Sequence, residues 1–121
     1  MIGKSESKKC DFEVKNSDGI MTVILDGEID HHSAVRVRSN IDAKIYELRP
    51  RALVLDLSRV NFMDSSGLGL IMGRYALIQK LSGEFSISEP SERVLRVFEL
   101  SGLGRIIKIE KSNKKEEGEN I

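Results

Sequence analysis

The fold of this 121-residue chain is decided by the run Ala52-Leu53-Val54-Leu55-Asp56-Leu57. Only Asp56 interrupts its apolar character. A nearly continuous apolar run of this length is typical of a central strand that is buried on both faces. Because such strands lie in sheets that helices cover, the run predicts an α/β domain.

A helix is predicted on each side of this strand. Before it, apolar residues recur at helical spacing over residues 33–48, and Pro50 cannot continue that helix. After it, residues 64–67 open a second helix, which Gly83 closes. The apolar residues of the first helix are Ala34, Val35, Val37, Ile41, Ile45 and Leu48. Those of the second helix are Leu68, Leu70, Ile71, Tyr75, Leu77, Ile78 and Leu81.

The N-terminal part of the chain predicts a hairpin. Residues 12–15 alternate between apolar and polar side chains, as a half-exposed strand does. Residues 16–19, Asn-Ser-Asp-Gly, have the chemistry of a turn, and an apolar run follows at residues 20–25. We therefore expect two antiparallel strands here.

The C-terminal part predicts two more strands around a third helix. A short strand at residues 85–87 precedes a helix that starts at residues 88–90, Ser-Glu-Pro, and ends at Gly102. The apolar face of this helix is Val94, Leu95, Val97, Phe98 and Leu100. A last strand covers residues 105–109. The predicted order is β-β-α-β-α-β-α-β, a mixed β-sheet with helices packed on it.

The composition excludes several classes of protein. The 19 lysines and arginines equal the 19 aspartates and glutamates in number, whereas domains that bind nucleic acid usually carry a clear basic excess. The single cysteine, Cys10, allows neither an internal disulfide nor a cysteine-rich zinc site. No run approaches the roughly 20 apolar residues of a membrane-spanning helix. We therefore expect a cytoplasmic protein that contacts neither nucleic acid nor a membrane.

The neutral total hides charged ends. Residues 1–9 carry a net charge of +2 and residues 110–121 a net charge of −1, which leaves −1 for the body between them. The last segment has one apolar residue, Ile121, and cannot bury enough surface to offset the entropy of ordering. We expect a mobile N-terminus at 1–9, one domain at 10–109 and a charged, disordered tail at 110–121.

The strongest local signal is Phe-Met-Asp-Ser-Ser-Gly-Leu-Gly at residues 62–69. It follows the buried strand and opens a helix, so its hydroxyls are expected at the carboxyl end of the sheet, where open α/β sheets bind ligands. A helix start also favours an anion such as phosphate. The plain alternative is that Asp64 or Ser65 is the helix N-cap and that the glycines allow close packing. Two adjacent serines exceed what one cap requires.

A second polar cluster lies at residues 27–33 and faces the same choice between chemistry and capping. It contains Asp30, His31 and His32 at the start of the first predicted helix. The histidine pair raises the question of a metal, but no other histidine exists and Cys10 lies near the end that is expected to be mobile. The alternative is that Asp30 caps the helix and that the histidines cover its first turn. We expect no metal.

Enzyme motifs are absent around these residues. A hydrolase triad of Ser65, His32 and Asp30 would need a Gly-x-Ser-x-Gly elbow, which neither serine has. The Gly-Lys-Ser/Thr ending of a phosphate-binding loop is also missing. Arg74 is expected to be a solvated or interface charge on the second helix. We expect a protein that is not an enzyme.

Three motifs together resemble the STAS domain family, and within it the bacterial anti-sigma factor antagonists, above all those of sporulation. The first covers residues 60–69 and continues to Gly-Arg-Tyr at 73–75. The second is Gly-Glu-Ile-Asp-His-His-Ser-Ala at 27–34, and the third is Phe-Glu-Leu-Ser-Gly-Leu at 98–103. One departure is that the sporulation relatives usually finish with another helix, for which residues 110–121 are a poor candidate.

The resemblance implies a cycle of partner switching. The unphosphorylated antagonist binds an anti-sigma factor that is also a serine kinase, which frees a sigma factor. That kinase phosphorylates the first serine after the aspartate, here Ser65, and a separate serine phosphatase reverses the step. The cycle requires no cofactor bound by this chain. The implied partner-binding residues are Asp30, His31, His32, Asp64, Ser66, Gly67, Leu68 and Gly69.

A second reading stays open. The chain could be a STAS module that binds a nucleotide or another small ligand in its crevice, with Ser65 serving only as a helix cap. Phosphorylation by the partner kinase separates the two readings.

Overall fold

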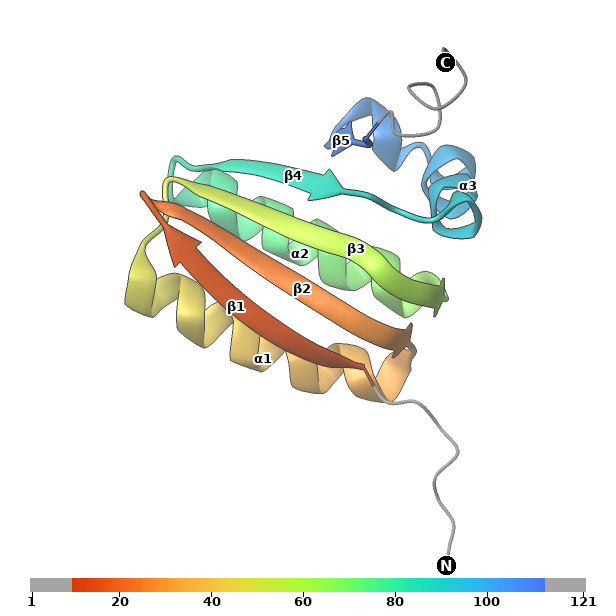
Figure 1. The fold of residues 1–121 in the computed structure, drawn as a ribbon, viewed down its shortest axis with the longest axis horizontal. Helices are drawn as coiled ribbons and strands as arrows, with labels where there is room; N and C mark the ends of the chain where they lie inside the picture. Colours follow the sequence, from red (N-terminus) through yellow and green to blue (C-terminus); the bar gives the residue numbers. More distant parts are fainter. Residues whose placement is uncertain (1–9, 113–121) are drawn as a thin grey trace, which may run out of the picture.

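The computed structural model describes residues 10–112, which form one five-stranded sheet (Figure 1). The strand order along the sheet is β1-β2-β3-β4-β5, the order of the sequence. β1 pairs with β2 in antiparallel register, and the other three pairs are parallel. The strands are β1 (Asp11–Ser17), β2 (Ile20–Ile29), β3 (Ala52–Met63), β4 (Glu84–Ser88) and β5 (Lys108–Glu110). The mixed α/β fold and the predicted order of elements are confirmed.

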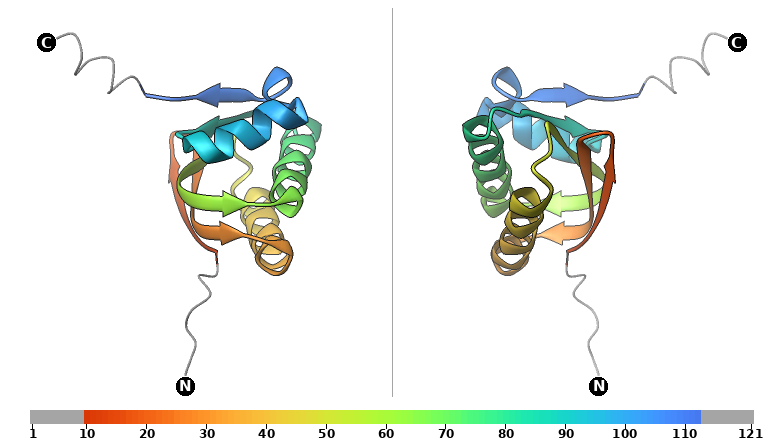
Figure 2. Two further views of the ribbon diagram at one scale, coloured as in Figure 1. Left: turned by 90° about the vertical axis from the view of Figure 1, so that its right-hand side faces the viewer. Right: turned by 90° about the vertical axis from the view of Figure 1, so that its left-hand side faces the viewer.

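Two long helices cover one face of this sheet (Figure 2). They are α1 (His31–Leu48) and α2 (Ser65–Lys80), which also contact each other. The third helix, α3 (Glu92–Ser101), lies beside the end of β4 and contacts β3 (Figure 1). Alternate residues of β3 point toward α1 and α2 and are fully buried, which makes β3 the centre of the core. Those residues are Leu53, Leu55 and Leu57.

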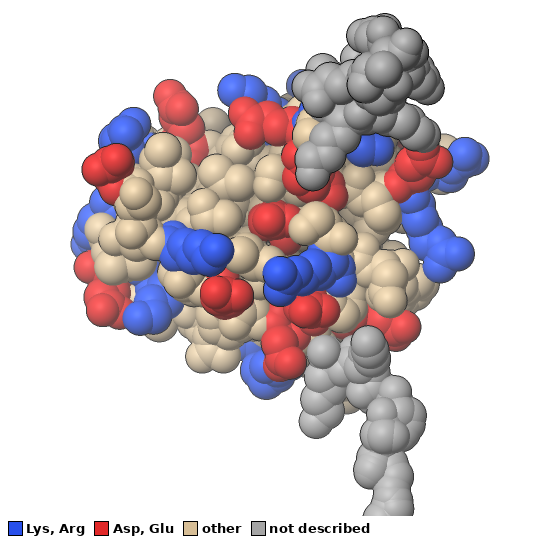
Figure 3. All heavy atoms as spheres, viewed as in Figure 1, with Lys and Arg blue, Asp and Glu red and all other residues tan. Residues whose placement is uncertain are grey.

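Among residues 10–112 no helix covers the opposite face of the sheet, and this face is half-buried rather than apolar throughout. In β3 its residues are Ala52, Val54 and Asp56, which are only partly buried. Figure 3 views this face and shows acidic and basic side chains interspersed with uncharged ones over it. The prediction that this strand is buried on both faces is therefore correct for the helix side only.

Several predicted boundaries are wrong, and tertiary contacts explain the differences. β2 and β3 run on to Ile29 and Met63 because they pair with each other across two register shifts. α1 starts at His31 rather than Ser33, since Asp30 is its N-cap. α2 ends at Lys80, and the left-handed residue after it is Ser82 rather than Gly83.

The C-terminal elements also differ in their starting points. α3 begins at Glu92 instead of residue 88, because the Ser91 hydroxyl accepts the N–H of Val94 and so caps the helix. Gly102 ends α3 in the left-handed conformation, as predicted. A short 3-10 helix, η1 (Leu103–Arg105), occupies part of the predicted last strand, so β5 starts only at Lys108.

Two predicted core residues are exposed. Val35 on α1 keeps 46% of its surface accessible, and Leu100 on α3 keeps 83%. Helical periodicity identified the apolar stripe in each helix but not its width. Both residues therefore lie on the outer surface of the domain.

The ordered body extends slightly past the predicted boundary at residue 109. Glu110 belongs to β5, and the Ser112 N–H donates to the Glu89 carboxylate at 3.1 Å. The predictions for residues 1–9 and 113–121 lie outside the described residues. Within residues 10–112, no helix has the length and apolar character needed to cross a membrane.

Candidate functional site

The junction between β3 and α2 carries the serine pair. Asp64 is the N-cap of α2, and its side chain accepts the Ser66 N–H at 2.8 Å. Ser65 is the first residue of the helix and is exposed, whereas Ser66 is half-buried. The Ser65 hydroxyl makes no hydrogen bond with the part of the chain that the structure describes. Asp64 therefore does the capping and leaves the Ser65 hydroxyl available.

Gly67 fixes how closely α2 approaches the end of β3. A Cβ added to Gly67 would lie 2.8 Å from the Cβ of Met63, the last residue of β3. That distance is shorter than atoms tolerate, so only glycine fits at this position. The close approach holds the first turn of α2 against the strand and leaves Ser65 on the outer side.

The junction between β2 and α1 is built in the same way. Asp30 accepts the Ser33 N–H at 3.0 Å, and the Ser33 hydroxyl accepts the Asp30 N–H at 3.0 Å, which makes a reciprocal capping box. The Ser33 N–H, and the Ser33 hydroxyl that donates to Asp30 Oδ1 at 3.1 Å, lower the pKa of the Asp30 carboxyl. His31 and His32 are exposed in the first turn of α1, with ring centroids 5.8 Å apart. The reading of Asp30 as a cap is confirmed.

The parallel register of β2 and β3 brings the two junctions together. Ile29 pairs with Met63, and the Asp64 N–H donates to the Ile29 carbonyl oxygen at 3.3 Å. Both helices therefore start at the same edge of the sheet, at the right of Figure 1. The two polar clusters at residues 27–33 and 62–69 are therefore neighbours in the fold.

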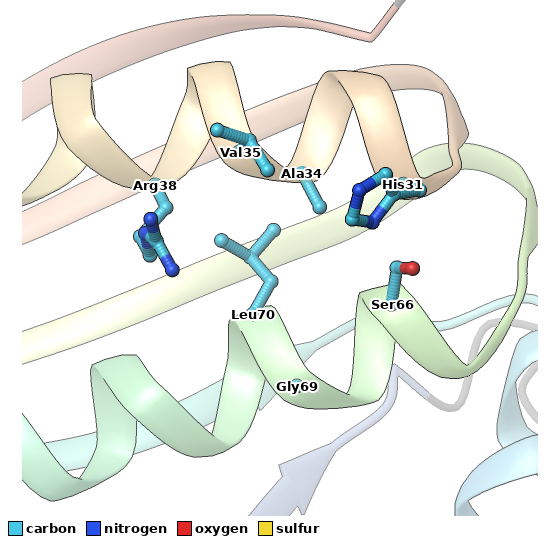
Figure 4. A pocket seen from close by; sticks show the side chains of 7 residues that line it. All are labelled: His31, Ala34, Val35, Arg38, Ser66, Gly69 and Leu70. Atoms are coloured by element: carbon cyan, nitrogen blue, oxygen red, sulfur yellow. The ribbon is translucent and has the colours of Figure 1, made fainter.

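A groove of about 250 Å³ separates the first turns of the two helices (Figure 4). His31 on α1 and Ser66 on α2 stand at one end of it, and Arg38 stands at the other. The groove is lined by His31, Ala34, Val35, Arg38, Ser66, Gly69 and Leu70. Of the predicted partner-binding residues, this brings together His31, Ser66 and Gly69.

The other predicted site residues lie around the groove rather than in it. Gly67 is buried against Met63, and Leu68 is half-buried on the core side of α2. Asp30, His32 and Asp64 belong to the two capped junctions.

Metal-binding groups do not converge in the described part of the chain. No three His, Cys, Asp or Glu side chains within residues 10–112 are placed to hold an ion. Cys10 is fully buried, and desolvation raises the pKa of its thiol to about 11. The thiol is therefore neutral at physiological pH.

Arg74 is the residue that sequence reasoning misplaced. Its side chain is only 7% exposed, and its Nε lies 2.8 Å from Asp42 Oδ1 on α1. It also donates from Nη1 to the Leu70 carbonyl oxygen at 3.3 Å. The prediction of a solvated or interface charge is wrong, because this ion pair ties α2 to α1 in the core.

Comparisons with known proteins agree with this geometry. A model of the STAS domain family matches residues 11–115. The anti-sigma F factor antagonist of Paenibacillus polymyxa is 40% identical over 98 residues, which cover 81% of this chain and 84% of the relative. The anti-sigma-B factor antagonist of Bacillus subtilis is 35% identical over 99 residues, which cover 80% and 87% of the two chains.

Solved structures give the same result. The anti-sigma factor antagonist SpoIIAA in its unphosphorylated form matches with a TM-score of 0.75 and 29% identity, over 91% of this chain and 95% of that one. The phosphorylated form of the Bacillus cell fate determinant SpoIIAA matches with a TM-score of 0.68 and 28% identity, over 91% and 98%.

Proposed function

The chain belongs to the STAS domain family and is an anti-sigma factor antagonist, and from this premise we propose that phosphorylation of Ser65 controls it. The unphosphorylated chain binds an anti-sigma factor that is also a serine kinase, and the sigma factor is released. Phosphorylation ends that binding, and a serine phosphatase restores it. The cycle runs in the cytoplasm, and the role of this chain in it is binding rather than catalysis.

The position of Ser65 carries this proposal. Its hydroxyl is exposed on the first residue of α2, next to an aspartate that already caps the helix. In the transfer, Ser65 Oγ bonds to the γ-phosphorus of ATP, the bond to the ADP oxygen breaks, and the hydroxyl proton leaves. The partner kinase supplies the nucleotide site, so this chain needs only to present the hydroxyl.

Electrostatics explains why the phosphate would end binding. A phosphate adds about −1.5 to −2 charges at neutral pH. Asp64 is the adjacent residue, and a carboxylate about 5 Å from an added charge repels it by roughly 3 kcal/mol at an effective dielectric constant of 20. Covering the phosphate with a partner also removes its water. A net penalty of about 3 kcal/mol weakens binding roughly 100-fold.

The fold itself tolerates the phosphate. The start of α2 presents backbone N–H groups and the positive end of the helix dipole, both of which favour an anion. Ser65 points outward, so the added group displaces no core side chain. The switch is therefore a change of surface charge at one point.

The alternative of a small-ligand module finds less support at this site. The groove beside Ser66 has about 250 Å³. Pockets that enclose small molecules usually measure roughly 300–1,000 Å³. The groove is also open along its length, which suits a side chain of a protein partner better than a nucleotide.

Phosphorylation of the purified chain tests the proposal. The kinase encoded beside this chain's gene is incubated with ATP, Mg²⁺ and the wild type, Ser65→Ala or Ser66→Ala, and the products are weighed. We expect one added phosphate on the wild type and on Ser66→Ala, and none on Ser65→Ala. Phosphopeptide mapping that finds the label on Ser66, with Ser65 unmodified, would contradict the assignment.

A further inference from the structure

The groove between α1 and α2 contains space that residues 10–112 do not fill (Figure 4). Its walls are largely apolar, with Ala34 and Val35 on α1 and Leu70 on α2. A Cβ placed on Gly69 would meet no atom within 4 Å. Val35 is 46% exposed although it borders this apolar groove. The groove therefore offers apolar surface with room for a further side chain.

Gly69 is not explained by the packing of the domain. Glycine inside a helix is less stable than alanine, so it usually reflects a need for space. Gly67 meets that description, because a side chain there would collide with Met63. Gly69, two residues later, has open space above it instead. The room at Gly69 is thus available to a molecule outside the chain.

The outer face of α2 is uncharged from Ser65 to Ala76. Ser65, Gly69, Met72 and Ala76 are all exposed, and their spacing of four, three and four residues places them on one side of the helix. Arg74 is the one charged residue between Ser65 and Gln79, and it is buried. The switch serine and the groove therefore share a continuous, uncharged helix face.

The charged groups that line the groove are basic or neutral. Arg38 stands at one end and His31 at the other, and no carboxylate lines the space between them. Asp42, one turn beyond Arg38, is engaged by Arg74. Within residues 10–112, Arg38 forms no ion pair. Charge complementarity at this groove favours an acidic group.

We propose that the groove receives an apolar side chain of the anti-sigma factor, with an acidic residue of the same segment against Arg38. This inference rests on the proposed function and extends it. A phosphate on Ser65 lies beside Ser66, which forms the groove wall, and on the same helix face as Gly69. It would therefore repel the acidic segment as that segment approaches the groove.

Filling the groove tests the apolar part of the proposal. Gly69→Leu fills the space, and Gly73→Leu adds the same bulk one turn further along α2, outside the groove. Neither position has an atom within 4 Å of the new Cβ, so both variants should keep the wild-type melting temperature or exceed it. We expect Gly69→Leu to weaken binding of the neighbouring-gene anti-sigma factor at least about tenfold, and Gly73→Leu by less than about threefold. Equal affinities for the two variants would overturn the groove as the docking point.

A charge reversal tests the acidic part. Arg38→Glu and Lys44→Glu make the same change in net charge on α1, but only Arg38 lines the groove. We expect at least about a tenfold loss of affinity for Arg38→Glu and little loss for Lys44→Glu at low salt. Comparable losses for both would show that only net charge matters and would overturn the specific contact.

The same measurements separate failure of this inference from failure of the proposed function. If the wild type does not bind the anti-sigma factor, or binds it equally well when phosphorylated, the proposed function is wrong and the inference falls with it. If the wild type binds and is released by phosphorylation while Gly69→Leu and Arg38→Glu bind like the wild type, only the groove assignment is wrong. Gly69→Ala, which adds a single methyl group, should give a loss between those of the wild type and Gly69→Leu.

Discussion

Arg74 Nε lies 2.8 Å from Asp42 Oδ1, and this ion pair joins α2 to α1 just beyond the groove. A second contact runs from Arg74 Nη2 to Asp42 Oδ2 at 3.3 Å. Burial lowers the pKa of the Arg74 guanidinium, and the Asp42 carboxylate opposes that shift. The pair thus holds a buried charge in place and fixes the spacing of the two helices.

Removing the carboxylate should destabilise the domain. Asp42→Asn leaves the guanidinium buried without its counter-charge, which costs roughly 3–5 kcal/mol for a fully buried pair. Asp42 keeps 30% of its side chain exposed, so we expect about 2 kcal/mol in urea unfolding. The double variant Asp42→Leu/Arg74→Met should recover more than half of that loss. If Asp42→Asn is as stable as the wild type, the ion pair between Asp42 and Arg74 contributes little to the stability of the domain.

Three glycines of α2 should respond to alanine in two different ways. Gly67→Ala forces a methyl group against Met63 and should cost about 1–2 kcal/mol of unfolding free energy. Gly69→Ala and Gly73→Ala enter open space and should each gain about 0.5–1 kcal/mol, since alanine favours a helix. Chemical unfolding of the three variants measures these changes in unfolding free energy. Destabilisation by Gly73→Ala would contradict this prediction.

The Asp30 cap should make stability depend on pH in the acid range. Hydrogen bonds from Ser33 hold the pKa of the Asp30 carboxyl in the folded state below its ordinary value of 3.8, so the cap contributes fully above that pH. Its contribution is lost as the pH falls below 3.8 through the folded pKa. Asp30→Asn keeps a good cap without the titration and should flatten this part of the curve. Asp30→Ala should lose about 1 kcal/mol at pH 7. If stability depends on pH in the same way in Asp30→Asn and the wild type, the Asp30 carboxyl is not the source of the pH dependence.

Ser65 variants should separate binding from release. Ser65→Ala keeps the uncharged surface and should bind the anti-sigma factor as tightly as the wild type, but kinase and ATP should no longer release it. Ser65→Asp adds one charge beside Asp64 and should bind roughly 10- to 100-fold more weakly. Titration calorimetry in low and high salt measures the affinity of each variant for the anti-sigma factor. High salt should reduce the difference in affinity between Ser65→Asp and the wild type. Ser17→Asp, which adds the same charge at an exposed position at the opposite end of the sheet, is the matched control, and an equal effect there would mean that the position of the added charge does not matter.

Cys10 should report on unfolding. Burial raises the pKa of its thiol to about 11 from its ordinary value of 9.0, so the folded state holds the neutral, unreactive form. We expect very slow labelling by a thiol reagent at pH 8 and rapid labelling in urea. Because the folded pKa is raised, this site favours the folded state below pH 9 and loses that contribution as the pH rises toward 11. Rapid labelling of the native protein at pH 8 would contradict the burial.

Local chemistry made much of the fold predictable. Asp30 and Asp64 sit directly before apolar periodic segments, and capping depends on only three or four neighbouring residues. The left-handed end of α3 at Gly102 follows from the same kind of short-range preference. The order of strands and helices was predictable because the spacing of apolar residues along the chain differs clearly between strands and helices.

Features that depend on distant residues were not predictable in the same way. Arg74 is buried because Asp42 lies 32 positions earlier on the neighbouring helix, and no local pattern reports that distance. β2 continues past Gly27 because β3 pairs with it there. The choice of Ser91 over Ser88 as a cap depends on where α3 can dock, since both residues are suitable caps by type. The groove required the relative placement of α1 and α2, of which the sequence predicted only that both helices start at one edge.

The match between strand order and sequence order has a consequence for synthesis. Each strand after β1 pairs with the strand that was made just before it, so its first partner is already present when it emerges. The contacts formed as the chain leaves the ribosome are therefore native ones, and few long loops must close. We expect the first three strands and both groove helices to assemble once residue 80 has emerged. Ser65, the proposed phosphorylation site, would therefore be presented as soon as α2 has packed against β3.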